Sequence, residues 1–371
     1  VDEYTRATLF YTDGITGDPK GVTYAHRQLV LHTLGVAAGL GPVPGQGGVH
    51  RGDVYMPITP LFHVHGWGFP YVATLLGLKQ VYPGRYEPAK LLGLIARHGV
   101  TFSHCVPTIL NMLLSAPEAA ETDLSRWKVI IGGSALPEGL AEAALARGID
   151  VHAAYGLSET CPFLTVADMV ASQAPGGAIE TRIATGRAAP LVELRVVDAE
   201  MKDLPHDGRT TGEIVVRSPW LTQGYLKDPA GSETLWQGGY LHTGDVGHIA
   251  DGGTLQITDR MKDVIKSGGE WISSLALESI ASLAEGVAEV AAVGIADEHW
   301  GERPCLVVVV ETGAEVGGVE TGIRDRIDEK IRRGQLSKWA APERVVFVEA
   351  LPKTSVGKLD KKVLRASLAA Q

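Results

Sequence analysis

VTFSHCVPTILNMLLSA at 100–116, KVIIGG at 128–133 and DVHAAYG at 150–156 are the segments that most clearly indicate the fold class. Each carries a short apolar run rich in β-branched residues, and a helical pattern separates one run from the next. Such runs, alternating with helices of roughly 10 to 15 residues, are typical of βαβ units in a parallel sheet. Ligands bind at the carboxyl ends of such strands, so we expect functional residues just after each run.

The same alternation extends toward the N-terminus, and the pattern then changes twice. Strands are predicted at 7–12, 53–59 and 79–83, and helices at 27–38, 68–78 and 88–99. Later strands punctuated by turns are predicted at 191–198, 212–218, 242–250 and 254–260, before a mixed pattern begins. The sequence therefore predicts an α/β large domain, 1–261, with a mostly parallel sheet flanked by helices (1–178) and a β-rich subdomain (179–261). A small mobile α+β domain, 262–371, would follow it.

Composition narrows the class of protein. With 371 residues, 45% of them hydrophobic, the chain can form more than one core. It carries 34 Lys and Arg against 43 Asp and Glu, a net charge of −9, which argues against nucleic acid or an anionic membrane as the main partner. Cys105, Cys161 and Cys305 lie far apart without CxxC spacing, which fits a reducing cytoplasm and neither a disulfide framework nor a zinc site.

Neither a membrane segment nor a secretory signal is apparent in the sequence. The first residues, VDEYTRATLFYT, enter a predicted strand and a functional-looking loop at once. We therefore expect that an N-terminal portion of the domain is absent.

The loop YTDGITGDPKGV, 11–22, is suited to an anion. Glycines let the backbone turn its N–H groups toward a phosphate, and hydroxyls and a lysine add donors and charge. It is not a Walker loop, because Lys20 is followed by Gly21 and the spacing differs. A plain Gly/Pro surface turn is the alternative. The candidate residues are Thr12, Gly14, Thr16, Gly17, Lys20 and Gly21.

A second cluster, YGLSETCP at 155–162, follows a predicted strand. The Tyr155 ring could stack on a base, the Glu159 carboxylate could hold Mg²⁺, and the hydroxyls of Ser158 and Thr160 could reach a phosphate. The same residues would also serve as an ordinary helix N-cap with an acidic first turn.

Two more candidates lie nearer the C-terminus. In YLHTGDVGHI, 240–249, Asp245 falls in a predicted Thr-Gly-Asp turn, and Arg260 follows in ITDRMKD. An aspartate can accept from both ribose hydroxyls and an arginine can add a donor, although turn aspartates are often structural. Lys358, after Gly357 in LPKTSVGKLDKK, is either functional or a solvated lysine of a basic tail.

In combination these motifs are specific. YTDGITGDPKGV, YGLSET, HTGD, DRMKDVIKSGGEWIS and PKTSVGK occur in the order and spacing of the adenylate-forming superfamily of acyl-CoA synthetases, adenylation domains and luciferases. Through 60–77, 24–33 and 266–273 the chain most resembles medium- to long-chain fatty-acyl-CoA synthetases. Relative to them it looks N-terminally shortened.

The resemblance implies a two-step reaction that uses ATP, Mg²⁺ and coenzyme A on a carboxylic acid, here a fatty acid. It assigns the β- and γ-phosphates to the 11–22 loop, Mg²⁺ to Thr12 and Glu159, and the α-phosphate to Thr160. The ribose falls to Asp245 and Arg260. The adenine slot would consist of Gly132, Gly133, Ser134, Tyr155 and Gly156.

The resemblance also implies a moving C-terminal domain. Lys358 would reach the carboxylate and α-phosphate, and the domain would rotate about a hinge at Lys262. His63 and Trp67 in FHVHGW would close the carboxylate end of the acyl tunnel, unless they are ordinary packing residues. The coenzyme A channel would be lined by Lys266, Gly268, Gly269 and Trp271.

Some alternatives stay open. Asp13 and Ile15 depart from the small or hydroxyl residues usual in the family, and Asp13 places a negative charge beside a polyanion. A catalytically weak or inactive nucleotide-binding protein is therefore a second hypothesis. A ligase for aryl or short thioether acids is a third. The acyl chain length and a possible homodimer are not decided by the sequence.

Overall fold

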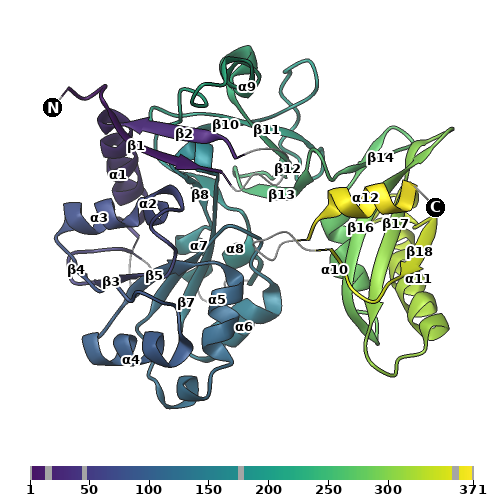
Figure 1. The fold of residues 1–371 in the computed structure, drawn as a ribbon, viewed down its shortest axis with the longest axis horizontal. Helices are drawn as coiled ribbons and strands as arrows, with labels where there is room; N and C mark the ends of the chain where they lie inside the picture. The colour runs from purple at the N-terminus through teal and green to yellow at the C-terminus, as the bar shows by residue number, and fades with distance from the viewer. Residues whose placement is uncertain (1, 13–18, 44–47, 174–178, 353–358, 370–371) are drawn as a thin grey trace. The chain divides into compact units, whose positions relative to one another are not determined.

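The computed structural model describes residues 2–12, 19–43, 48–173, 179–352 and 359–369. Within this part of the chain the largest sheet has seven strands, in the order β4-β3-β5-β6-β7-β8-β9 (Figure 1). Strands β4 to β7 are parallel, whereas β8 and β9 add antiparallel, so the predicted parallel sheet is confirmed. The strands are β3 (Val54–Pro57), β4 (Lys79–Gln80), β5 (Phe102–Cys105), β6 (Lys128–Ile131), β7 (Asp150–Gly156), β8 (Phe163–Val166) and β9 (Arg187–Ala188).

Helices cover both faces of this sheet because successive side chains of a strand point to opposite sides. In β6, Val129 and Ile131 pack toward α4, α5 and α6, while Ile130 packs toward α1 and α3. Both faces are thus apolar and buried. The helices of this region are α1 (His26–Leu40), α2 (Val64–Trp67), α3 (Phe69–Leu76), α4 (Pro88–His98), α5 (Pro107–Leu114), α6 (Glu138–Ala146), α7 (Met169–Gln173) and α8 (Ile179–Ile183), with 3₁₀ turns at Pro117–Glu121 and Ser158–Thr160.

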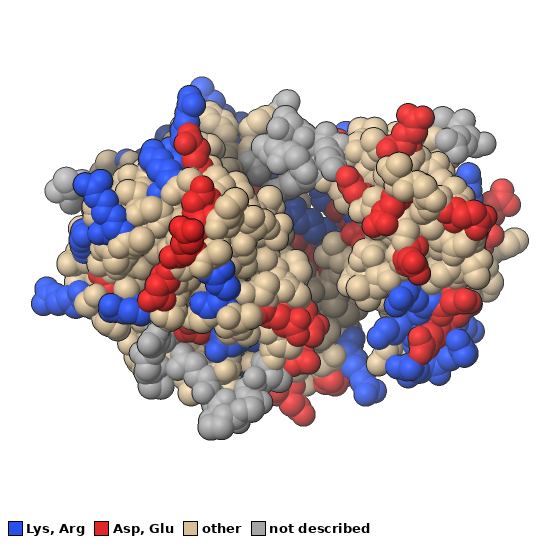
Figure 2. All heavy atoms as spheres, turned by 90° about the horizontal axis from the view of Figure 1, so that it is seen from below, with Lys and Arg blue, Asp and Glu red and all other residues tan. Residues whose placement is uncertain are grey.

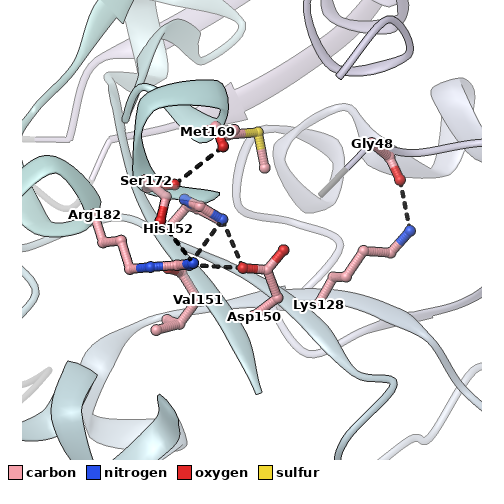
Figure 3. Close-up of polar contacts among 8 residues, drawn as sticks. All are labelled: Gly48, Lys128, Asp150, Val151, His152, Met169, Ser172 and Arg182. Atoms are coloured by element: carbon pink, nitrogen blue, oxygen red, sulfur yellow. Dashed lines mark hydrogen bonds and ion pairs between the residues drawn. The ribbon is translucent and has the colours of Figure 1, made fainter. Parts of the chain in front are cut away.

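Buried polar contacts fix the amino-terminal edge of the same sheet. Lys128, the first residue of β6, donates to the Gly48 carbonyl at 2.6 Å (Figure 3). It also pairs with the Asp53 carboxylate at 2.8 Å. Asp53 in turn accepts from the Thr101 hydroxyl at 2.7 Å. A buried charge is costly unless it is paired, so separating Lys128 from Asp53 would be unfavourable. The network therefore holds the loop before β3 against the starts of β5 and β6.

A second buried cluster lies at the start of β7 (Figure 3). Arg182 of α8 donates to the Asp150 carboxylate at 2.6 Å, and His152 lies 2.9 Å from the same oxygen. Burial raises the pKa of Asp150, but the contacts with His152 and Arg182 outweigh it and hold that pKa at about 2. Arg182 also donates to the Ser172 carbonyl of α7 at 3.3 Å. The cluster therefore fastens the short helices α7 and α8 to the sheet.

The first predicted strand does not join the parallel sheet, so this expectation is wrong. Among the described residues, β1 (Arg6–Tyr11) pairs antiparallel with β2 (Gly21–Ala25) in a separate two-stranded sheet. The predicted loop therefore connects β1 to β2 rather than a strand to a helix. Helix α1 begins directly after β2.

The β-rich region forms the sheet β10-β11-β12-β13. Asp245 lies inside strand β12, so the predicted turn around it is wrong, although Gly244 before it has a positive φ of 68°. The strands are β10 (Glu193–Val197), β11 (Gly212–Arg217), β12 (Leu241–Ile249) and β13 (Leu255–Arg260), with α9 (Pro229–Leu235) and a 3₁₀ turn (Gln237–Gly239) between β11 and β12.

The chain divides into two compact units. One comprises Val1–Thr210, Ile214–Thr243 and His248–Gln256; the other comprises Thr211–Glu213, Gly244–Gly247 and Ile257–Gln371. The predicted boundary at Lys262 stays a prediction. Over the face drawn in Figure 2, acidic and basic side chains are interspersed. Among the described residues, none of the helices has the length and apolar character that a membrane crossing requires.

The second unit is built on a mixed sheet of order β15-β14-β17-β16, with β18 parallel to β17. Alternate residues of β17 pack on α10 and α11 on one face and on α12 on the other. The elements are β14 (Ile265–Ser267), β15 (Glu270–Ile272), α10 (Ser274–Ala281), β16 (Val287–Asp297), β17 (Gly301–Val310), α11 (Val316–Arg332), a 3₁₀ turn (Lys338–Ala340), β18 (Arg344–Phe347) and α12 (Lys361–Ala369).

Candidate active site

The carboxyl edge of the parallel sheet brings two predicted motifs together. Strand β6 ends at Ile131 and runs directly into Gly132 and Gly133, while the neighbouring parallel strand β7 ends at Tyr155 and Gly156. Gly133 has a φ of 78°, a backbone conformation that favours glycine. The predicted adenine-slot residues therefore lie at one edge of the sheet.

Gly156 has no room for a side chain. A Cβ built on it would lie 1.5 Å from the Pro162 carbonyl oxygen, so the chain can fold back after β7 only with glycine at this position. The turn that follows, Ser158–Thr160, is a single 3₁₀ turn that carries Glu159 at its centre.

The two hydroxyls of this turn have different surroundings. Thr160 is fully buried; its Oγ1 accepts from the Leu157 N–H at 2.9 Å and contacts the Pro162 carbonyl oxygen. Ser158 is partly exposed. The Thr160 hydroxyl therefore shapes the turn, and Ser158 carries the more exposed of the two hydroxyls. The phosphate contact expected of Thr160 stays a prediction.

A tyrosine that sequence reasoning missed joins two of the motifs. The Tyr225 hydroxyl donates to the Glu159 carboxylate at 2.8 Å, and the Lys20 ammonium lies 4.4 Å from the centre of the Tyr225 ring. Burial, followed by the nearby Glu159 carboxylate, raises the pKa of Tyr225, so the phenol stays protonated and keeps donating. A cation over the face of an aromatic ring is attracted to it. Tyr225 thus contacts one cationic and one anionic group.

Backbone contacts reinforce this junction. The Thr222 N–H donates to the Glu159 carbonyl at 3.0 Å, and the Leu226 N–H donates to the Gly21 carbonyl at 2.7 Å. Lys20 is also 3.8 Å from the Asp228 carboxylate, with both side chains partly exposed. The segment around Tyr225 therefore holds β2 and the Glu159 turn in place, while the Lys20 ammonium stays accessible.

The predicted phosphate loop is closed at its base. The Thr12 N–H donates to the Lys20 carbonyl at 3.0 Å, and the Lys20 N–H donates to the Thr12 hydroxyl at 3.1 Å. These contacts set Thr12 and Lys20 opposite each other at the two ends of the loop. The other loop residues discussed from the sequence lie outside the described residues: Asp13, Gly14, Ile15, Thr16 and Gly17.

A strained turn precedes helix α3 and carries the expected acyl-tunnel residues. His63 precedes a left-handed run in which Val64, His65 and Trp67 all have positive φ, at 45°, 61° and 57°. Positive φ is strained for residues other than glycine, and most of all for a β-branched valine. The Trp67 ring lies against Gly132, where an added Cβ would meet it at 3.2 Å. The turn therefore brings Trp67 to the glycines that follow β6.

In the second unit, Asp245 and Arg260 meet as predicted. The Arg260 Nε lies 3.4 Å from the Asp245 carboxylate, whose side chain is 6% exposed against 48% for that of Arg260. The Met261 N–H donates to the Gly244 carbonyl at 2.8 Å and holds the two segments together. Lys262 follows as an exposed residue between β13 and β14, and Lys358 lies outside the described residues.

The same unit has an aromatic hollow of about 460 Å³, lined also by two basic and two acidic side chains, that sequence reasoning missed. The rings of Trp300 and Trp339 lie 4.4 Å apart between centroids, and the Lys338 ammonium is 5.0 Å from the Trp339 ring. Gly268, at a φ of 60°, packs directly on Trp339, and its N–H donates to the Trp300 carbonyl at 3.0 Å. The lining residues are Asp297, Trp300, Arg303, Lys338, Trp339 and Glu343.

The other residues predicted to line the coenzyme A channel are Lys266, Gly269 and Trp271, which flank Gly268 in the sequence. Lys266 places its ammonium 5.6 Å from the Trp271 ring, across the β14–β15 hairpin in which they pair. Gly269 completes the turn at a φ of 82°. No sequence signal pointed to Trp300 or Trp339, because each is an isolated tryptophan until the sheet brings them together.

Within the described residues, no three side chains of His, Cys, Asp and Glu gather as a metal site. Glu159 nonetheless offers a partly exposed carboxylate, the oxygen ligand that Mg²⁺ prefers, usually together with substrate phosphates rather than with a full protein cage. The donor chemistry is therefore compatible with a metal that arrives with its nucleotide.

Comparison with known proteins gives consistent results. Residues 1–226 match the model of the AMP-binding enzyme family, and 276–358 match that of the AMP-binding enzyme C-terminal domain. The chain is 40% identical to the long-chain-fatty-acid–CoA ligase of Thermus thermophilus and 40% identical to the 3-methylmercaptopropionyl-CoA ligase of Ruegeria lacuscaerulensis. Each match covers 98% of this chain, which spans 66% of the length of either relative.

A solved structure is also similar. The ATP-bound MatB of Rhodopseudomonas palustris superposes with a TM-score of 0.81 at 28% identity, over 99% of this chain and 69% of that one. This similarity confirms the predicted fold class.

The Gly156 contact gives a stability test. We expect Gly156→Ala to lower the free energy of unfolding by more than about 3 kcal/mol, because the new methyl would overlap the Pro162 carbonyl. Gly139→Ala is the matched control: this helical glycine has nothing within 4 Å of an added Cβ, and alanine should stabilise by about 0.5 to 1 kcal/mol. Urea denaturation of both variants measures the difference; equal stability of the two would contradict the close contact.

Proposed function

This chain belongs to the AMP-binding enzyme family, and from that premise we propose that it is an AMP-forming acid–thiol ligase. In the first step a carboxylate oxygen of the acid attacks the α-phosphorus of ATP and releases pyrophosphate. In the second, the thiol sulfur of coenzyme A attacks the acyl carbonyl carbon, AMP leaves, and the thiol proton passes to solvent.

The observation that carries the proposal is the junction at Tyr225. Lys20 and Glu159 come from motifs far apart in the sequence, yet both contact this one side chain. In-line displacement at phosphorus needs positioning and charge neutralisation more than covalent chemistry. A lysine for the β- and γ-phosphates beside a carboxylate for Mg²⁺ supplies both. Bound Mg²⁺ would neutralise phosphate charge and orient the pyrophosphate leaving group.

The remaining roles are assigned as proposals. Thr12 and Thr16 contribute to phosphate and metal binding, and Thr160 or Ser158 contacts the α-phosphate. Asp245 and Arg260 bind the ribose. Lys358 reaches the carboxylate and α-phosphate during adenylation, with Lys262 as the hinge of the C-terminal domain. The adenine slot consists of Gly132, Gly133, Ser134, Tyr155 and Gly156.

We place the nucleotide end of coenzyme A at the hollow lined by Trp300 and Trp339. The Trp300 indole is 46% exposed and offers a surface on which adenine can stack. Arg303 and Lys338 offer positive charge for the phosphates, while Asp297 and Glu343 are the acidic residues of the lining. Gly268 packs on Trp339, so the pantetheine arm would run from this hollow along Lys266, Gly268, Gly269 and Trp271.

Two classes of acid substrate are supported equally. Similarity to the long-chain-fatty-acid ligase of Thermus thermophilus supports a fatty acid, and similarity to the Ruegeria ligase supports a short thioether acid. The chain is 40% identical to each of them. His63 and Trp67 would meet the acid in either case, because Trp67 lies at the glycines that end β6.

Pyrophosphate release tests the first step. We expect it to require both ATP and a carboxylic acid, and we expect Lys358→Ala to reduce it by about 100-fold or more, as for the loss of a transition-state charge contact. The variant should still form thioester from supplied acyl-AMP. Lys362→Ala, at an exposed lysine of α12, is the control and should behave as wild type.

Two outcomes would contradict this assignment. No release with any acid from butanoate to octadecanoate would reject adenylation, and AMP binding without turnover would favour a non-catalytic nucleotide-binding protein. Equal loss of both half-reactions in Lys358→Ala would reject the role given to that lysine.

The coenzyme A site has its own test. We expect Trp300→Ala to raise the KM for coenzyme A about tenfold or more, because stacking on one base contributes about 1 to 3 kcal/mol. Adenylation measured without coenzyme A should not change. Leu283→Ala, at another exposed apolar residue of the same unit, is the control. An unaltered KM for coenzyme A in Trp300→Ala and Lys338→Met would reject the site.

A further inference from the structure

A fully buried histidine, His104, lies at the same carboxyl edge and has no role in the assignments above. It is the third residue of β5, the strand next to β6, and it has no exposed surface. Its side chain points to the same face of the sheet as Phe102, toward α3.

Both ring nitrogens of His104 are engaged. Nε2 lies 2.7 Å from the Tyr55 hydroxyl, and Nδ1 lies 3.1 Å from the Thr59 hydroxyl. Burial lowers the pKa of His104 to about 3, so the ring is neutral at ordinary pH, with one nitrogen donating and the other accepting. Removing the ring would leave the buried Tyr55 hydroxyl without its partner, which is costly, and would leave the Thr59 hydroxyl with the His104 carbonyl at 3.4 Å.

The faces of the ring are also occupied. Phe69 stacks on His104 at 4.8 Å between ring centroids, with 26° between the planes, and Trp67 lies at 5.1 Å with 35°. Trp67 is therefore confined between His104 on one side and Gly132 on the other. Since interiors are close-packed, Trp67 cannot turn toward β5 unless His104 gives way.

We propose that His104 is a specificity-determining positioning residue, which fixes Trp67 and fills the volume behind it so that the enzyme favours short acids over long ones. The inference rests on the proposed function, in which the acid meets Trp67. An acid whose chain ends at Trp67 fits without change. A longer chain directed past Trp67 toward β5 has to displace His104 and break its contacts with Tyr55 and Thr59.

Acid-dependent pyrophosphate release with butanoate, octanoate and hexadecanoate tests the proposal. We expect the wild type to have its highest kcat/KM with butanoate. His104→Ala should raise the octanoate-to-butanoate ratio of kcat/KM about tenfold or more, since single methylenes already discriminate by such factors in apolar pockets. His104→Phe keeps the ring volume and should keep the wild-type ratio. The KM for ATP should stay unchanged in both.

Two further variants keep the test decisive if His104→Ala folds poorly. Trp67→Ala removes the group that His104 positions and should raise the same ratio. His152→Ala removes another fully buried histidine, at the amino-terminal half of β7, and should lower stability without changing the ratio (Figure 3). This control separates a specificity role from a merely structural one.

A wild-type preference for octanoate or hexadecanoate would overturn the proposal, as would an unchanged ratio in both His104→Ala and Trp67→Ala. Absence of pyrophosphate release with every acid would instead reject the proposed function, so the two failures are distinguishable.

Discussion

The hydrogen bond from Tyr225 to Glu159 is the contact on which the arrangement of the candidate site depends. It attaches the turn after β7 to the segment around Tyr225. The Lys20 ammonium, which follows the loop between β1 and β2, lies over the ring of the same tyrosine. The hydrogen bond adds to the backbone contacts by which the segment around Tyr225 already joins Glu159 and Gly21. The phenol donates to the Glu159 carboxylate, and carboxylate oxygens are ligands that Mg²⁺ accepts. A single neutral side chain thus contacts two opposite charges.

Glycines supply the space that this arrangement requires. Gly156 allows the chain to return over the Pro162 carbonyl, and Gly132 admits the Trp67 ring at van der Waals distance. The left-handed turn from Val64 to Trp67 is strained, and strain of this kind persists only where the surrounding packing enforces it. Here His104 and Gly132 flank Trp67, and Thr8, Phe10 and Tyr24 contact His65. Packing therefore holds this turn in place.

The sequence predicted the parallel sheet because strand and helix periodicity are local properties that each segment carries by itself. Val129, Ile130 and Ile131 already show that β6 is buried on both faces. It did not predict Tyr225, Trp300 or His104, because each acquires a role only through partners distant in the chain. The pairing of β1 with β2 was not predicted, because the sequence pattern of a strand does not show which other strand it pairs with. The different burial of Thr160 and Ser158 was not predicted either, because burial is not visible in a run of three residues.

Calorimetric titration of ATP can show whether Lys20 and Glu159 form one site for ATP with Mg²⁺. We expect Lys20→Met to weaken ATP binding about tenfold, or about 1.4 kcal/mol, both with and without Mg²⁺. Glu159→Gln should weaken it only when Mg²⁺ is present, because the Glu159 carboxylate acts through the metal. Wild-type affinity of both variants in the presence of Mg²⁺ would show that the two side chains do not form such a site.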